Sequence, residues 1–201
     1  MYVVPDRWIE ELIGFNFHRG ILACARRLPT ATLVDLAGPR DRKLAMTVCA
    51  GIQDRENLGS ILRTSLALGA NASLLGPQTC DPFARRVLRV SMGAVLQMPL
   101  AMSNDLATDL VALRDRHGVE LVATVLDPQA EPLAACRVAD RFALVLGNEG
   151  YGLPPQITEL CQRQVTIPMS ADVDSLNVGV AAGILLYGLQ HRGGEDHPSV
   201  D

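Results

Sequence analysis

Short apolar runs alternate with longer segments of helical periodicity between residues 44 and 189. The runs are apolar on both faces, which is typical of strands buried inside a parallel sheet. Six strands are predicted, at Ala45–Cys49, Ala72–Leu75, Val95–Leu100, Leu121–Val125, Phe142–Leu146 and Gln164–Ile167. Five helices are predicted, at Leu58–Leu68, Pro82–Val90, Asn104–His117, Pro154–Cys161 and Ser175–Leu189. This alternation predicts an α/β fold in which helices cover both faces of a parallel sheet.

The last predicted helix follows a loop rich in small polar residues. Pro168 stops the preceding strand, and residues of the helix-capping type follow it, at Asp172, Asp174 and Ser175. We therefore expect the helix to begin near Ser175. From Val178 onward it is apolar on nearly every side, and its glycines and alanines leave it thin. Such a helix is typical of a protein core or of the contact between two subunits.

Asn177 is an amide near the start of this apolar helix. A buried polar group without a partner costs roughly 1–3 kcal/mol, so the hydrogen bonds of the amide must be met. Two interpretations of Asn177 stay open from the sequence: it caps or ties the loop, or it faces a ligand. The stretch as a whole is either an ordinary capped core helix or part of a site.

The first 40 residues form an N-terminal segment of their own. Short helices are predicted at Asp6–Ile13 and Ile21–Arg27, which is too little chain to fold alone. A polar, turn-rich stretch, Ala37–Lys43, separates them from the regular alternation. We therefore divide the chain into residues 1–40, a main domain at 44–190, and a polar tail at 191–201 that we expect to be loose.

The composition is that of a soluble globular protein, with 48% hydrophobic and 20% charged residues among 201. The longest apolar run, Val178–Leu189, has 12 residues and three glycines, whereas a membrane span needs about 20 residues. We expect no membrane segment, and the N-terminus has none of the features of a secretory signal. The five cysteines are odd in number and form no CxxC pair. They indicate reduced thiols and a cytoplasmic protein.

The net charge of −4 argues against a protein that coats nucleic acid by charge alone. Of the 18 basic residues, however, 17 are arginine and only Lys43 is lysine. Arginine presents a planar fork that suits phosphate, although genome composition explains the same bias. Two interpretations also stay open for three arginines of one predicted helix, Arg85, Arg86 and Arg89: they form either a phosphate track or a solvated helix face.

The loops after the strands carry the candidate chemistry, because ligands of parallel α/β sheets bind at the carboxyl ends of the strands. The loop Gly147–Gly152 has its glycines as GxxGxG, not as the dinucleotide fingerprint GxGxxG, which argues against a nicotinamide-dependent oxidoreductase. The chain has no GxxxxGK[ST], and its four histidines never pair at metal-ligand spacing, so we expect no metal and no Ser-His-Asp set. What remains is a ligand held by backbone groups beside an arginine and several amides. From their own segment alone, Asn57 and Arg63 are either a helix cap and an incidental arginine or parts of such a site.

Three of these loops, taken together, match a known pattern. They read N-x-G-x-x-x-R after the first strand, G-N-E-G-x-G after a late strand, and I-P-M-(x)5-S-L-N-V before the last helix. In this order and spacing they resemble the three motifs of the SpoU/TrmH-type RNA ribose 2′-O-methyltransferases of the SPOUT class. The segment Arg89–Ala94 fits the same pattern, and the resemblance covers Leu44 to Leu189. It implies a parallel-sheet fold with a deep trefoil knot at its C-terminal end, which periodicity alone does not predict.

The resemblance implies S-adenosylmethionine as the cofactor and methylation of a ribose 2′-hydroxyl in tRNA or rRNA as the reaction. The cofactor would be held by backbone groups around five positions, Thr124, Gly147, Ile167, Met169 and Leu176. The active site would consist of Asn57, Arg63, Glu149, Ser175 and Asn177. In this scheme Arg63 anchors phosphate or ribose, because arginine stays protonated, Glu149 braces Asn57 or its loop, and Ser175 and Asn177 orient the nucleotide.

The resemblance also implies a homodimer, with the last helix in the interface and Arg63 reaching the cofactor of the partner. The segment Phe17–Ala23 resembles the end of an RNA-binding domain that precedes the catalytic domain in longer members, so residues 1–40 are expected to be a remnant of a substrate-binding domain. A non-catalytic RNA-binding or ribosome-assembly factor on the same scaffold stays open as an alternative function. The target RNA, the methylated nucleotide and the general base are not indicated by the sequence.

Overall fold

The computed structural model describes residues 23–170 and 175–191, together with positions 3–5, 8–9, 11, 14 and 21. Its centre is a seven-stranded sheet in which all pairings are parallel, in the order β3-β2-β1-β6-β4-β7-β5. The strands are β1 (Leu44–Cys49), β2 (Ala72–Leu75), β3 (Leu100–Met102), β4 (Glu120–Thr124), β5 (Glu131–Pro132), β6 (Arg141–Leu146) and β7 (Arg163–Thr166). Every residue of β1 and β6 is buried, which confirms the predicted burial of both sheet faces.

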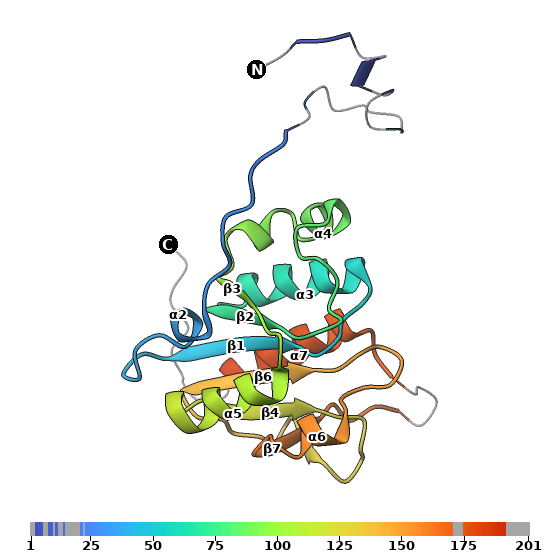
Figure 1. Cartoon of the computed structure of the whole chain (residues 1–201). Helices are drawn as coiled ribbons and strands as arrows, with labels where there is room; N and C mark the ends of the chain where they lie inside the picture. The colour runs from blue at the N-terminus through green and yellow to red at the C-terminus, as the bar shows by residue number, and fades with distance from the viewer. Residues whose placement is uncertain are drawn as a thin grey trace, which may run out of the picture.

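Helices pack on both faces of the sheet, as predicted (Figure 1). They are α2 (Leu33–Ala37), α3 (Arg55–Ala67), α4 (Arg85–Val90), the 3-10 helix η1 (Ala94–Leu96), α5 (Leu106–His117), α6 (Pro155–Thr158) and α7 (Val178–Gln190). One core lies under α3, α4 and α7, and the other lies under α2, α5 and α6. The described residues include no helix that is both long enough and apolar enough to cross a membrane.

Two of the predicted elements are wrong. Of the predicted strand Val95–Leu100, only Leu100 belongs to a strand: Val95 and Leu96 lie in η1, after Gly93 has turned the chain in the left-handed region at φ 81°, and the β3 ladder to β2 begins at Leu100. The predicted helix Ile21–Arg27 is also wrong, since residues 23–27 have no helical structure. A helix this short is marginal without packing, and here Arg27 instead pairs with Asp81 near the start of α4.

Other differences concern one helix that was not predicted and the length of another. The helix α2 lies in a stretch to which we assigned no element, and it begins with a capping box in which Thr32 and Asp35 bond reciprocally. The helix α6 covers only Pro155–Thr158, about half of its predicted span. Most of the predicted helix Asp6–Ile13 and the tail after His191 lie outside the described residues.

The strand order brings the carboxyl ends of β4, β6 and β7 together, although they are far apart in the sequence. Ala123 of β4 pairs with Val145 of β6, and Thr124 pairs with Val165 of β7. The loops that follow these strands therefore start side by side at one edge of the sheet. This is the edge at which a parallel α/β sheet binds its ligand.

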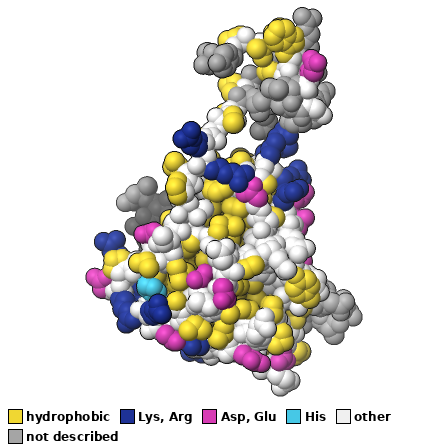
Figure 2. Space-filling view, in the orientation of Figure 1, with side chains coloured by type: hydrophobic (Ala, Val, Ile, Leu, Met, Phe, Trp, Pro, Cys, Tyr) yellow, Lys and Arg dark blue, Asp and Glu magenta, His cyan; other side chains and the backbone are white. Residues whose placement is uncertain are grey.

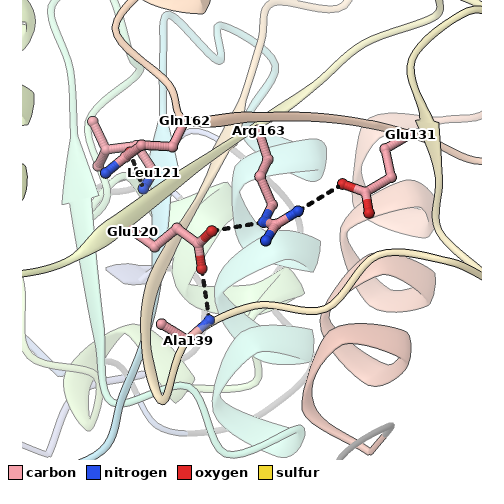
Figure 3. A network of polar contacts seen from close by, with 6 residues as sticks. All are labelled: Glu120, Leu121, Glu131, Ala139, Gln162 and Arg163. Carbon is pink, nitrogen blue, oxygen red and sulfur yellow. Dashed lines mark hydrogen bonds and ion pairs between the residues drawn. The ribbon is translucent and has the colours of Figure 1, made fainter.

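The opposite edge of the sheet is fastened by a polar network (Figure 3). Arg163, at the start of β7, donates to Glu120 at 2.6 Å and to Glu131 at 3.1 Å. Glu120 also accepts from the backbone N–H of Ala139 at 2.6 Å, and Gln162 accepts from the N–H of Leu121 at 2.8 Å. The network joins β4, β5 and β7 at their amino ends and so supports the register of these strands.

Helix α7 approaches α3 closely because small residues face each other. A Cβ added at Gly179 would lie 2.8 Å from the Ser60 oxygen, and one at Gly183 would lie 3.1 Å from the Thr64 methyl group. The thin face predicted for this helix is therefore used inside one chain, against α3. The neighbouring face, about a quarter turn around the helix, carries the exposed side chains Val180, Ile184 and Tyr187.

Candidate active site

The first motif folds as the start of α3, and its cap is not Asn57. The Asp54 carboxylate accepts from the backbone N–H groups of Glu56 at 2.7 Å and Asn57 at 2.9 Å, so the helix begins at Arg55. The interpretation of Asn57 as a helix cap is thus wrong. Because Asp54 satisfies the helix end, the Asn57 side chain is free to bond elsewhere.

Three polar side chains from the three motifs form one chain of hydrogen bonds, which we call the amide relay: Asn177, Asn57 and Glu149. The Asn177 Nδ2 donates to the Asn57 Oδ1 at 2.7 Å. The Asn57 Nδ2 donates in turn to the Glu149 Oε1 at 2.9 Å. The relay joins residues that are 120 and 92 positions apart in the sequence.

The direction of the relay is fixed at both ends. Asn177 is the N-cap of α7, and its Oδ1 accepts from the N–H groups of Gly179 at 2.9 Å and Val180 at 3.3 Å. Backbone N–H groups only donate and an ionised carboxylate only accepts, so both amides between them have one orientation. Of the two interpretations of Asn177, capping is therefore confirmed, and the same side chain also holds Asn57.

The start of α7 differs from the prediction. The helix begins at Val178, three residues after the predicted start at Ser175, because the cap is Asn177. The other predicted caps, Asp172 and Asp174, lie outside the described residues. Ser175 is exposed and lies two residues before the cap.

The loop that carries Glu149 is held in a tight turn by Asn148, a residue that the sequence reasoning missed. Asn148 is 8% exposed; its Nδ2 donates to the Gly51 carbonyl at 2.8 Å and its Oδ1 accepts from the Gly150 N–H at 2.8 Å. Its backbone pairs with Gly152 in both directions, at 3.0 and 2.9 Å. Asn148 stands inside the quoted G-N-E-G-x-G motif, next to the glutamate, and that position was the available signal.

Gly147 begins this loop at a point where only glycine fits. A Cβ there would lie 2.4 Å from the backbone carbon of Gly152 and 2.5 Å from the nitrogen of Leu153. Both atoms belong to the main chain, so no side-chain movement relieves the contact. The close approach lets the loop fold back over the end of β6.

The predicted cofactor-binding residues fall into two groups in the structure. Thr124, Gly147 and Ile167 end or directly follow β4, β6 and β7, and so lie at neighbouring strand ends. The Thr124 hydroxyl donates to the Val145 carbonyl at 3.0 Å, so this side chain is already used within the sheet. Met169 and Leu176 are half-buried on either side of residues 171–174 in the next loop. These positions offer main-chain groups rather than free polar side chains, which fits a ligand gripped by backbone.

Arg63 lies apart from the relay of its own chain. It is exposed on α3, and its guanidinium has no hydrogen bond or ion pair with another described residue. Thr64, the next residue, packs on Gly183 of α7. Because successive helix residues point about 100° apart, Arg63 faces solvent beside the α3–α7 contact.

Two buried thiols, Cys49 and Cys136, and the partly buried thiol of Cys161 are not reactive groups. Burial raises the pKa of Cys49 to about 12, and it raises the pKa of Cys136 and of Cys161 to about 11. A thiol in this range stays protonated near neutral pH and is a poor nucleophile and metal ligand. Among the described residues no cluster of three or more His, Cys, Asp or Glu side chains is placed to hold a metal ion.

Comparison with known proteins decides the family. Residues 45–187 match the model of the SpoU rRNA Methylase family. The chain belongs to this family. It is 39% identical over 183 residues to an uncharacterised tRNA/rRNA methyltransferase of Mycobacterium bovis, covering 89% of this chain and 62% of that protein. It is 31% identical over 182 residues to the 23S rRNA (guanosine-2′-O-)-methyltransferase RlmB of Acinetobacter baylyi, covering 89% of this chain and 73% of that protein.

A solved structure agrees with these relatives. The AdoMet-bound rRNA methyltransferase from Sinorhizobium meliloti superposes with a TM-score of 0.72 at 30% identity, covering 80% of this chain and 60% of that one. The comparisons confirm the family that the three motifs predicted and S-adenosylmethionine as the cofactor used in it. This chain spans 62% of the length of the mycobacterial relative.

Proposed function

We propose that this protein transfers the methyl group of S-adenosylmethionine to a ribose 2′-hydroxyl of tRNA or rRNA in the cytoplasm. The observation that carries the proposal is the amide relay, in which the three motifs meet through two hydrogen bonds of 2.7 and 2.9 Å. Membership of the SpoU rRNA Methylase family supports the reaction class. The guanosine-2′-O activity named for the RlmB relative supports the ribose as the acceptor.

The cofactor fits the edge of the sheet where β4, β6 and β7 end. Main-chain groups near Thr124, Gly147, Ile167, Met169 and Leu176 would hold it. Gly147 supports this assignment because its loop folds back so closely that a Cβ would overlap the backbone of Gly152. When bound, S-adenosylmethionine supplies an electrophilic methyl group beside a neutral leaving thioether.

The side chains of the relay position the acceptor rather than react themselves. Glu149 is exposed and held at one oxygen by Asn57, which leaves its second oxygen to accept from a nucleotide hydroxyl. Asn57 is fixed in turn by Asn177 and by the start of α7. This arrangement orients the acceptor. The entropic cost of bringing two substrates into line is a large part of the reaction barrier, and a site that holds the acceptor in place lowers it. Ser175, which is exposed and lies two residues before Asn177, would contact the same nucleotide.

Arg63 would complete the active site of a partner subunit in a homodimer. Its guanidinium faces solvent beside the α3–α7 contact and is unpaired among the described residues. On α7, Val180, Ile184 and Tyr187 are 52, 40 and 53% exposed and recur at helical spacing, so they form one apolar stripe. An exposed apolar stripe of this kind is typical of a protein contact. We infer that two copies pack through α7, and that the path of the loops after β6 and β7 forms the trefoil knot implied by the family.

The direct test supplies the purified protein with methyl-labelled S-adenosylmethionine and with total tRNA and rRNA from a strain that lacks the gene. The RNA is digested to nucleosides, and the labelled nucleoside is identified by mass spectrometry. We expect a 2′-O-methyl ribonucleoside. Label on a base would contradict the proposal, and cofactor binding without any transfer would favour the non-catalytic RNA-binding alternative.

Two variants connect this activity to the residues. Asn57→Ala is expected to lower transfer by about 100-fold or more, the usual effect of removing a preorganised polar group from an active site. Arg63→Ala is expected to abolish transfer while the affinity for the cofactor changes by no more than a few-fold. Loss of cofactor binding in Arg63→Ala would overturn its role as an anchor for phosphate or ribose.

A further inference from the structure

A second polar site lies where α4 meets the start of α3. A cavity of about 290 Å³ is lined there by Ala84 and four arginines: Arg55, Arg85, Arg86 and Arg89. Three of the arginines come from α4, and Arg55 is the first residue of α3. The sequence indicates a run of three arginines on one short helix, and the fold adds the fourth from a distant segment. We call this the arginine cavity.

The arginine cavity has an excess of positive charge although the whole chain carries −4. Glu56 accepts from the Nε of Arg86 at 3.1 Å, so Arg86 is paired with a carboxylate. Asp81, near the start of α4, is already bound by both arms of Arg27, at 3.1 and 2.6 Å. Neither Arg55 nor Arg89 has a hydrogen bond or ion pair from its guanidinium to another described residue. Like charges gathered in this way repel one another unless an anion lies between them.

The chemistry of the lining selects the anion. Guanidinium groups bind phosphate through paired, parallel hydrogen bonds, and four of them around one small volume offer several such forks. The lining has no aromatic or amide side chain with which to stack on or read a base, and Ala84 is its one apolar residue. All four arginines are exposed, so a polymer can reach them. Figure 2 shows Lys and Arg side chains gathered at the α4 end of the molecule.

The position of the arginine cavity relative to the amide relay indicates which molecule supplies the phosphate. Arg55 and Asn57 lie in the first turn of α3, and residues two apart on a helix point in nearly opposite directions. Glu56, between them, is tied to Arg86 of α4, while Asn57 is tied to Asn177 of α7. The arginine cavity and the relay therefore occupy the two flanks of a helix that is about 10–12 Å across with its side chains. A nucleotide held at the relay has its neighbouring phosphates within reach of the cavity.

We propose that the arginine cavity binds the phosphodiester backbone of the RNA substrate next to the nucleotide that is methylated. This inference rests on the proposed function and adds to it the surface that holds the flanking RNA. Because the contacts are to phosphate, the cavity contributes affinity and register but no preference for a base sequence. Arg55 and Arg89 carry most of the effect, since neither is engaged by a carboxylate.

The test compares the double variant Arg55→Gln/Arg89→Gln with wild type and with a matched control, Arg42→Gln/Arg116→Gln, which removes two exposed arginines elsewhere. RNA affinity is measured between 50 and 300 mM KCl with the RNA that the wild-type protein methylates. Each phosphate contact contributes about 0.7–0.9 to the slope of log affinity against log salt, so the cavity variant is expected to lose roughly 1.5 from the slope. We expect its affinity at low salt to fall by tenfold or more, KM for RNA to rise and cofactor affinity to stay within twofold. The control should keep its slope within a few tenths.

A charge-preserving variant separates charge from packing. Arg55→Lys/Arg89→Lys is expected to keep the salt slope and to lose only part of the affinity, because lysine keeps the charge without the fork. A slope equal in the glutamine variant and the control would overturn the inference while leaving the proposed function intact. Isothermal titration with inorganic phosphate identifies a site for the free ion. If phosphate saturates the wild-type cavity below millimolar concentration while the salt slope for RNA is the same in the glutamine variant and the wild type, the cavity binds free phosphate and not RNA, and the inference is again overturned. If the wild-type protein neither binds nor methylates RNA, the proposed function fails as well.

Discussion

At the scale of single residues, the candidate site depends on two amide side chains, Asn177 and Asn57, that each have partners on two sides. Asn177 caps α7 with its oxygen and holds Asn57 with its nitrogen, and Asn57 passes the same direction on to Glu149. The three residues themselves were predicted from the motif resemblance. Their hydrogen bonds were not, because a pattern of residue types does not indicate which amide donates to which acceptor. Asn148 shows the same limit: it was visible in the motif, but its role depends on a carbonyl 97 residues away.

Substitution of Asn177 separates its two roles. Aspartate caps a helix as well as asparagine does, but an ionised carboxylate cannot donate to the Asn57 oxygen. We expect Asn177→Asp to unfold in urea with wild-type stability and to lose methyl transfer by about 100-fold or more. Asn177→Ala should lose the same activity and in addition about 0.5–2 kcal/mol of unfolding free energy. Full activity in Asn177→Asp would show that the relay is not needed.

At the scale of elements, the strands were predicted well where both faces are buried and poorly where a turn intervenes. The segments at β1, β2, β4, β6 and β7 carry apolar runs that leave little alternative, and the structure has them within a residue or two. The run Val95–Leu100 is also largely apolar, yet the preceding Gly93 has a positive φ, Val95 and Leu96 lie in η1, and the strand begins only at Leu100. Apolar content alone does not distinguish a strand from a short buried turn. The register that brings the ends of β4, β6 and β7 side by side could not be predicted from the sequence either, because it depends on pairings between distant strands.

The loop after β6 offers a matched pair of glycines for testing the cofactor site. In Gly147→Ala the new methyl group overlaps the backbone of Gly152 at 2.4 Å, so the loop must open. At Gly150 the nearest atom to such a methyl group is the Asn148 oxygen at 3.4 Å, an ordinary contact. We expect Gly147→Ala to lose about 1–3 kcal/mol of unfolding free energy and to bind S-adenosylmethionine about tenfold more weakly or worse. Calorimetric titration of Gly150→Ala should give nearly wild-type affinity; equal effects in the two variants would contradict this account of the loop.

At the scale of the whole molecule, the two cores keep several thiols protonated, and this makes stability depend on alkaline pH. Burial raises the pKa of Cys49 from 9.0 to about 12. Below pH 9 the thiol is protonated in both the folded and unfolded states, so it contributes no pH dependence. Above pH 9 the unfolded chain releases the proton and the folded chain does not, so stability falls as pH rises toward 12.

The corresponding measurement is urea unfolding between pH 8 and pH 10.5. We expect the free energy of unfolding to be flat up to about pH 9 and then to fall by up to about 1.4 kcal/mol per pH unit from Cys49. Cys49→Ala is the control, because it is less stable at every pH but should lose less with each unit above pH 9. Equal slopes for the two proteins above pH 9 would show that the buried thiol does not carry the effect.

In the proposed function, the active site is complete only when two copies of the chain assemble. Within one chain the relay is assembled while Arg63 faces solvent, and α7 presents an apolar stripe beside it. A two-fold dimer through α7 accounts for both observations, because each copy would supply Arg63 to the relay of the other. The surface pattern was predictable only in part: the sequence indicated a thin apolar helix, but its small residues face α3, and the exposed apolar stripe lies on the neighbouring face.

The measurement that tests this account most directly mixes two inactive variants, Asn57→Ala and Arg63→Ala, under conditions in which subunits exchange. If Arg63 acts on the partner's relay, a mixed dimer has one intact site and one site that lacks both groups. Random exchange makes about half of the dimers mixed, so methyl transfer should return to about a quarter of the wild-type rate. If both residues act within one chain, every site in the mixture lacks one group. Transfer that stays at the level of the separate variants would contradict an active site shared between two copies.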